Sequence, residues 1–210
     1  MDIDAATQRY FAEWKEKELQ RTDETLRVGG APVMFTWEEP LMAEFAKRLD
    51  VNGQDVLEIG FGMGVAATCM QQYGPRSHTI LEPHPAIYQM AMNWREKFAT
   101  EITIINDYWQ NKILELPKVD VVFYDSSNAD GNVHKDKFAF FELAAKQLLR
   151  AGGRLGFWYK GDALPGDYQR ELMKWFDSVH LTWVGDLEPT YEAQVLGFGQ
   201  TMIVPIAKLD

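Results

Sequence analysis

The chain has 210 residues, longer than one average domain and shorter than two, so we expect one compact domain with short extensions. Hydrophobic residues make up 46% and charged residues 25%, as in folded globular chains, and a net charge of −10 argues against binding nucleic acid through phosphate contacts. The single cysteine, Cys69, excludes an intrachain disulfide and a cysteine-rich zinc site, and we expect no metal. Neither a signal peptide nor a membrane span can be recognised, which favours a cytoplasmic protein that binds no membrane.

The first 30 residues form the first predicted unit. Tyr10, Phe11 and Trp14 lie among charged residues from residue 5 to 20, a pattern typical of a short amphipathic helix. A polar stretch follows and ends at Gly29-Gly30, which we interpret as a loop. We therefore predict a helical arm or lid over residues 1–30, and one domain over residues 31–210.

Strands and helices alternate through the rest of the chain. A helix with Leu41, Phe45 and Leu49 on one face precedes the first strand. We predict strands at 55–59, 78–82, 102–105, 119–124, 154–159, 179–184 and 201–206, and helices at 65–72, 86–98, 137–149 (closed by Gly152-Gly153) and 168–176. The last two strands, with only loop-like sequence between them, should form an antiparallel pair. This order predicts a doubly wound α/β fold, a mostly parallel, Rossmann-like sheet of seven strands.

The segment VLEIGFGMG, residues 56–64, carries the main chemical signal. It places Glu58, Gly60, Gly62 and Gly64 between a strand and a helix, where glycines allow close approach of a ligand to the backbone. In the dinucleotide motif the third glycine comes one residue later, and the carboxylate of Glu58 would repel a pyrophosphate. A cofactor with an ammonium and no phosphate, such as S-adenosylmethionine, suits the motif better than a nicotinamide dinucleotide.

Glu82 supports the same interpretation. It lies 22 residues after Gly60, at the end of the second predicted strand of the sheet, where an acid can accept hydrogen bonds from both ribose hydroxyls. The alternative is an ordinary glycine-rich turn with a surface glutamate. A nicotinamide-dependent reductase on a similar fold is the competing enzyme class.

Together these stretches resemble the class I methyltransferases, and within them guanidinoacetate N-methyltransferase and its guanidino-methylating relatives. The resemblance rests on several separated motifs: APVMFTWEEPLM (31–42), VLEIGFGMG, Leu81-Glu82, Asp107-Tyr108-Trp109, VVFYD (121–125), LLRAGG (148–153) and MIVPIA (202–207). It implies an S-adenosylmethionine-dependent N-methyltransferase that acts on a small cationic guanidino compound, similar to guanidinoacetate or arginine, and releases S-adenosylhomocysteine.

The resemblance also implies roles for individual residues. Glu38 and Asp125 match the two acids that hold the guanidino group, although by themselves they could be a helix-start acid and a loop cap. Two carboxylates suit a planar cation with paired N–H donors, and we expect Asp125 to act as the base and Glu38 to orient the substrate. The further residues expected to contact the cofactor are Met34, Trp37, Glu58, Gly60, Gly62, Gly64, Glu82, Pro83, Asp107, Tyr108, Trp109 and Asp125, and those expected to contact the substrate are Tyr10, Trp14, Ser126 and His134.

The sequence leaves the substrate open. Asp125 is followed by Ser126-Ser127-Asn128 where the guanidinoacetate enzyme has a threonine, a tyrosine and a proline. Another small amine or carboxylate-bearing metabolite could take the place of the guanidino compound. The oligomeric state, with a homodimer among the options, is also open.

Overall fold

The computed structural model describes residues 5–126 and 133–210, without the side chains of residues 5, 6 and 133–135. Within these residues the main sheet has seven strands in the order β6-β5-β4-β7-β8-β10-β9. β10 runs antiparallel to both of its neighbours, and the other strands pair in parallel. The strands are β4 (Asp55–Ile59), β5 (Ser77–Leu81), β6 (Glu101–Ile105), β7 (Val119–Tyr124), β8 (Leu149–Phe157), β9 (Ser178–Val184) and β10 (Met202–Lys208). The predicted doubly wound fold and its closing antiparallel pair are confirmed.

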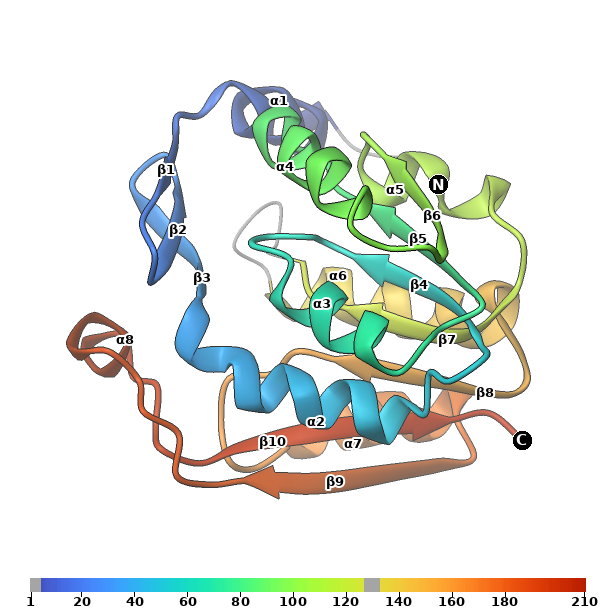
Figure 1. Ribbon diagram of the computed structural model, residues 1–210. Coiled ribbons are helices and arrows are strands. Elements are labelled where there is room, and N and C mark those ends of the chain that lie inside the picture. Colours follow the sequence, from blue (N-terminus) through green and yellow to red (C-terminus); the bar gives the residue numbers. More distant parts are fainter. Residues whose placement is uncertain (1–4, 127–132) are drawn as a thin grey trace.

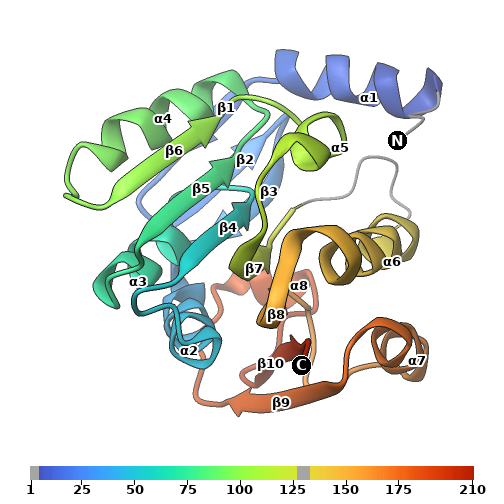
Figure 2. The ribbon, with the colours of Figure 1, turned by 90° about the vertical axis from the view of Figure 1, so that its right-hand side faces the viewer.

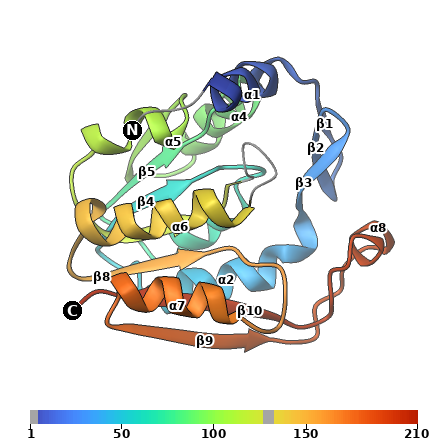
Figure 3. The same ribbon diagram turned by 180° about the vertical axis from the view of Figure 1, so that it is seen from behind.

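Helices cover both faces of this sheet (Figures 1 and 3). β7 is apolar on both faces, because its side chains alternate between two cores: Val121 and Phe123 pack toward α2, whereas Val122 and Tyr124 pack toward α6. One face carries α2 (Glu39–Leu49), α3 (Val65–Gln72) and α4 (Pro85–Arg95), and the other carries α5 (Trp109–Lys112), α6 (Val133–Leu143) and α7 (Gly166–Trp175).

The N-terminal segment contains more regular structure than predicted. α1 (Ala5–Glu16) agrees with the predicted helix, but the stretch expected to be a loop contains β1 (Leu19–Arg21) and β2 (Thr25–Val28). These strands form an antiparallel sheet with β3 (Ala31–Phe35). Gly29 and Gly30 form the two-residue turn between β2 and β3, both with positive φ, the backbone that such hairpin turns require. The division of the chain at residue 30 stays a prediction, and a hairpin turn lies at that position.

Two further segments differ from the prediction. The helix expected over 137–149 gives way to a π-helical turn, Ala144–Leu148, and β8 begins at Leu149, so that Gly152-Gly153 lie in a strand. Leu149 pairs with Val119 of β7 across a register shift, and this sheet pairing outweighs the glycine stop signal. A short helix, α8 (Tyr191–Val195), forms in the stretch between β9 and β10 that was expected to be a loop; its first turn is capped by the side chain of Thr190.

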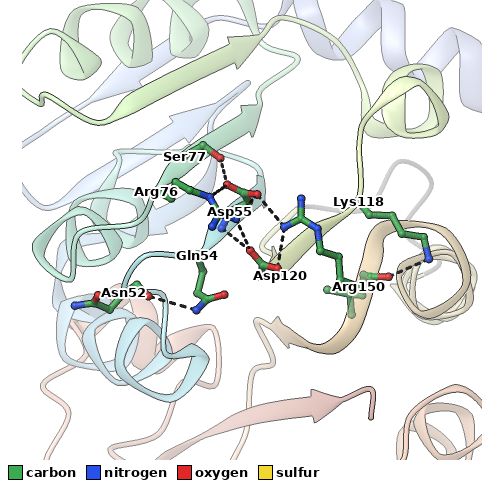
Figure 4. A network of polar contacts seen from close by, with 9 residues as sticks. Asn52, Gln54, Asp55, Arg76, Ser77, Lys118, Asp120 and Arg150 are labelled. Atoms are coloured by element: carbon green, nitrogen blue, oxygen red, sulfur yellow. Dashed lines mark hydrogen bonds and ion pairs between the residues drawn. The ribbon is translucent and has the colours of Figure 1, made fainter.

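The amino ends of the parallel strands hold a network of ion pairs (Figure 4). Asp55 accepts hydrogen bonds from both Arg76 and Arg150, and Asp120 accepts from the same two arginines. Asp120 also accepts the backbone N–H of Asp55 at 2.9 Å, which links β7 to β4. In the part of the chain that the structure describes, no helix is both long and apolar enough to cross a membrane.

Candidate active site

The glycine turn lies at the carboxyl end of β4, between that strand and α3 (Figure 1). Gly60 has a φ of +93°, and a Cβ at this position would lie 2.2 Å from the backbone oxygen of Asp125. Only glycine can therefore let the ends of β4 and β7 approach so closely. Met34 of β3 packs on the turn, where its sulfur accepts the N–H of Met63 at 3.0 Å. Gly60, Gly62 and Met34 all line a small cavity of about 80 Å³.

Glu82, just after β5, faces the same small cavity. Its carboxylate accepts the backbone N–H of Phe61 at 3.0 Å and that of His84 at 2.8 Å. Burial raises the pKa of this carboxyl to about 7, although the backbone hydrogen bonds oppose the shift. The backbone hydrogen bonds fix the Glu82 carboxylate next to the glycine turn, where it can accept hydrogen bonds from two hydroxyls of a ligand.

Glu38 and Asp125 line a larger cavity of about 470 Å³ at the same edge of the sheet. Glu38 ends a 3-10 turn, Thr36–Glu38, and is only 4% exposed. It accepts the N–H of Phe35 at 3.1 Å and the indole N–H of Trp158 at 2.8 Å. Burial raises the pKa of Glu38 to about 7. Burial and the nearby charge of Glu38 raise the pKa of Asp125 to about 8, and both acids are therefore poised to gain a cationic partner.

Lys137 of α6 is a buried cation that the structure adds to this cavity. Its side chain is buried, and its Nζ donates a hydrogen bond to the backbone oxygen of Trp158 at 2.7 Å. Burial lowers the pKa of Lys137 to about 8, and the charge of Asp125 opposes that shift. Trp158 thus holds Lys137 through its carbonyl and Glu38 through its indole.

α1 lies beside α5 (Figure 2), and an aromatic slot of about 30 Å³ is lined by residues of α1 and of the segment that enters α5. Phe11 of α1 stacks on Tyr108 with ring centroids 3.6 Å apart, and the hydroxyl of Tyr108 donates to the backbone oxygen of Phe11. Tyr10, Trp14 and Trp109 also line the slot. The helical arm is therefore docked on the domain through aromatic side chains.

The three cavities form a continuous series. Pro83 and Trp14 line both the aromatic slot and the glycine-turn cavity, and Met34 and Asp125 line both the glycine-turn cavity and the acid cavity. Ser126 lines all three. The series thus runs from aromatic rings, past Glu82 and the glycines, to the paired carboxylates. This order matches a nucleoside followed by a reactive group and a cationic substrate.

Several predicted site residues lie elsewhere. Glu58 points toward α3, on the same face of β4 as Val56, and its Oε2 lies 2.8 Å from Nε2 of His78. Trp37 packs against Phe198 behind the acid cavity, with ring centroids 5.3 Å apart. None of Glu58, Trp37, Gly64 and Asp107 lines the three cavities.

The other residues predicted to belong to the site lie at different positions around the cavities. Gly64 precedes α3 with a φ of +76°, and Asp107 accepts the backbone N–H of Tyr108. Tyr10 and Trp14 were expected to contact the substrate, but neither lines the acid cavity: Tyr10 lines the slot, and Trp14 lines the slot and the glycine-turn cavity. The side chain of His134 lies outside the described residues. Among the described residues, no group of three or more His, Cys, Asp or Glu side chains could hold a metal ion.

Most residues in the walls of the acid cavity were not predicted from the sequence. They include Phe35, Lys137, Trp158, Tyr159, Lys160, Tyr168, Leu196 and Phe198. One feature of the sequence could have indicated the position of Lys137. This residue lies three and four residues before Phe140 and Phe141, both of which are fully buried. Helical spacing therefore places Lys137 on the apolar face of α6.

Solved structures with the same fold include a spermidine synthase and several methyltransferases. Spermidine synthase from Thermotoga maritima aligns with a TM-score of 0.63 at 14% identity, over 92% of this chain and 72% of that chain. A T. thermophilus 16S rRNA methyltransferase in complex with AdoMet and guanosine aligns with a TM-score of 0.60 at 17% identity, over 93% of this chain and 50% of that chain. These similarities show the class I methyltransferase fold.

Curated relatives are named protein arginine N-methyltransferase 2. The protein from Cryptococcus neoformans is 29% identical over 65% of this chain and 44% of its own length, and that from Kluyveromyces lactis is 32% identical over 74% of this chain and 39% of its own length. The chain thus spans less than half the length of these relatives.

The sequence also matches a family profile. The profile described as guanidinoacetate N-methyltransferase matches residues 5–185, most of the 210 residues of the chain. The match includes the glycine turn, both acids of the large cavity and the aromatic slot, and it confirms the predicted class of methyltransferase. The chain belongs to the guanidinoacetate N-methyltransferase family.

Proposed function

We propose that the protein transfers a methyl group from S-adenosylmethionine to a guanidino nitrogen of a small cationic compound. The observation that carries this proposal is the pair of acids, Glu38 and Asp125, that line one cavity with pKa values raised to about 7 and about 8. A guanidinium offers several N–H donors in one plane, and two carboxylates can accept them in pairs. The family and the name of the curated relatives support the same nucleophile.

The residues along the smaller cavities suit S-adenosylmethionine. Glu82 would accept the ribose hydroxyls, the glycine turn would contact the amino-acid tail, and Tyr108 and Trp109 would contact the adenine. When bound, the cofactor supplies an electrophilic methyl group on a sulfonium. The aromatic slot and the glycine-turn cavity, at about 30 and 80 Å³, are smaller than typical ligand pockets. We propose that α1 and Met34 shift on binding and that the arm then acts as a lid.

The two acids have different roles in the proposed reaction. A guanidinium has no free lone pair, so the reacting nitrogen must lose a proton as the new N–C bond forms. Asp125 lines both the acid cavity and the glycine-turn cavity and can take this proton at its carboxylate. Glu38, fixed by Trp158 and the N–H of Phe35, would hold the remaining N–H groups in place.

The test is a screen with S-adenosylmethionine that carries an isotopically labelled methyl group. Guanidinoacetate, free arginine, arginine peptides and simple amines are incubated with the protein, and the labelled product is identified by mass spectrometry. We expect label on a guanidino nitrogen. Label only on amines or on carboxylates would refute the guanidino assignment, and no transfer to any acceptor, despite bound S-adenosylhomocysteine, would refute the enzymatic function.

Composition supports two further proposals. The net charge of −10 favours a substrate that is not a nucleic acid. A cytoplasmic location stays a prediction from the single cysteine.

A further inference from the structure

Lys137 has no role in the methyl transfer described above, although it lies in the same cavity as the two acids. It is 4% exposed, and a lysine so deeply buried is rare unless it has a partner. The hydrogen bond of its Nζ to the oxygen of Trp158 uses one of three N–H donors. Among the described residues, no carboxylate lies within ion-pair distance of this nitrogen.

The cavity therefore holds a buried lysine and two acids, groups of opposite charge when ionised, that do not pair with each other. Asp125 and Lys137 influence each other through charge, yet they make no ion pair. A buried charge without a partner of opposite sign costs free energy, which a complementary group on a ligand can offset. A ligand with a cation at one end and an anion at the other would neutralise both sites at once.

Lys160 does not offer a comparable site. Its side chain lies at the rim of the cavity, where Nζ donates to the backbone oxygen of Leu196 and lies 5.1 Å from the centre of the Phe198 ring. It is exposed, so water can solvate it without a ligand. The buried lysine is the one whose charge a ligand must complement.

We infer that Lys137 is the anion-binding residue of the substrate cavity, which selects a guanidino compound that carries a carboxylate. This inference rests on the proposed function. It assigns the guanidinium to Glu38 and Asp125 and the substrate carboxylate to Lys137. An arginine side chain within a protein has no carboxylate beside it, so the cavity favours a free guanidino acid.

The inference is tested with matched acceptors that differ only in the carboxylate. Guanidinoacetate is compared with methylguanidine, and N-acetylarginine with its amide, in steady-state assays of the wild type. A charge-assisted hydrogen bond contributes enough to give the carboxylate member a kcat/KM about ten- to a hundredfold higher. If the wild type methylates both members of each pair with equal kcat/KM, the inference is wrong while the proposed function stands. If it methylates no guanidine, the proposed function fails.

The variant Lys137→Met then assigns the preference to this side chain. We expect kcat/KM for the carboxylate member to fall about ten- to a hundredfold, much further than for the other member, whose smaller change comes only from the higher pKa of Asp125 once the charge of Lys137 is gone. Equal losses for both members with a displaced pH profile would mean that Lys137 acts on Asp125 instead. Weaker binding of S-adenosylhomocysteine in calorimetry would mean that Lys137 binds the carboxylate of the cofactor. Either result would overturn the inference.

Two more variants control for folding and charge. Lys137→Gln keeps a polar group of similar length and should lose the preference in the same way, which separates loss of charge from loss of packing. Lys146→Met removes the same charge from an exposed position just after α6, where Nζ pairs with Glu142, and should keep the preference. Loss of the preference in Lys146→Met would show that net charge, and not the cavity, selects the carboxylate.

Discussion

At the amino ends of the parallel strands two aspartates lie between two arginines. At the carboxyl ends two buried acids, Glu38 and Glu82, and the half-buried Asp125 share one cavity system with a buried lysine. The pKa values of the two groups shift in opposite directions. Hydrogen bonds from Arg76 hold the pKa of Asp55 far below its usual value, and hydrogen bonds from Arg150 and the N–H of Asp55 outweigh burial and lower that of Asp120. At the other end, burial raises the pKa of each acid.

This difference separates acids that have cationic partners within the protein from acids that do not. The amino-end network supplies cations for its acids and is partly exposed, with Arg76 58% exposed, so it needs no ligand. The acids at the carboxyl ends lack such cations, and their burial costs stability that a cationic ligand can restore. The first region contributes to the stability of the sheet, and the second is suited to binding.

The largest effect is expected from Asp125→Asn. The substitution keeps the shape of the side chain but removes the base, so kcat should fall by roughly 10²- to 10⁴-fold while the affinity for S-adenosylhomocysteine changes little. Steady-state kinetics and calorimetry measure the two quantities. A near-normal kcat would remove Asp125 as the base and leave it as an electrostatic anchor.

Glu82→Ala should act on the cofactor. Loss of a charged acceptor should weaken binding of S-adenosylmethionine by about 1.5 to 3 kcal/mol, roughly ten- to a hundredfold. The substitution also leaves the N–H groups of Phe61 and His84 without their acceptor, so the melting temperature should fall. Glu82→Gln, which keeps one acceptor oxygen, is the matched control for this structural effect. Unchanged affinity in calorimetry would rule out Glu82 as the ribose ligand.

Asp120→Ala should lower stability without affecting the reaction. It removes the acceptor of two arginines and of the N–H of Asp55, at a cost of roughly 1 to 2 kcal/mol because the network is partly exposed. Thermal unfolding should shift down by a few degrees, with kcat and cofactor affinity unchanged. A changed kcat would show that the two ends of the sheet are coupled.

The pH dependence of stability should separate the two ends. Glu38 and Asp125 bind protons more tightly in the folded than in the unfolded state, so the free energy of unfolding should decrease as the pH rises from about 4 to about 8. The amino-end aspartates, with lowered pKa values, contribute stability that is lost only below about pH 4. Denaturant unfolding of the double variant Glu38→Gln, Asp125→Asn should show a flatter profile between pH 4 and 8. An equally steep profile would exclude these two acids as its source.

Much of the fold follows from local patterns, and parts of the site do not. β7 could be predicted because a continuous apolar run is typical of a strand that is covered on both faces. Gly60 could be predicted because its spacing from Glu82 is typical of a nucleoside site. β1 and β2 were missed because they are only three and four residues long, although residues 25–28 alternate polar and apolar and Gly29-Gly30 is a hairpin signal.

The misplaced side chains have a common cause. Glu58 was expected at the cofactor, but the two-residue alternation of β4 turns it toward α3 and His78. Lys137 and Trp158 are far apart in sequence, and only the parallel packing of β7 and β8 brings them to the acids. Burial and charge in this cavity depend on tertiary contacts, which no local pattern contains.

Whether Glu38 and Asp125 bind the guanidinium is tested most directly by counting the protons released when a guanidino compound binds. Calorimetric titration of the protein and S-adenosylhomocysteine with guanidinoacetate, or with the acceptor found in the labelled screen, is carried out at pH 7 in buffers of different ionisation enthalpy. Glu38 and Asp125 hold protons at this pH because their pKa values are raised to about 7 and about 8, and a bound guanidinium lowers both. Net proton release is expected, and it should decrease in Asp125→Asn. Binding without proton release, or with uptake, would contradict the assignment of the guanidinium to these two acids.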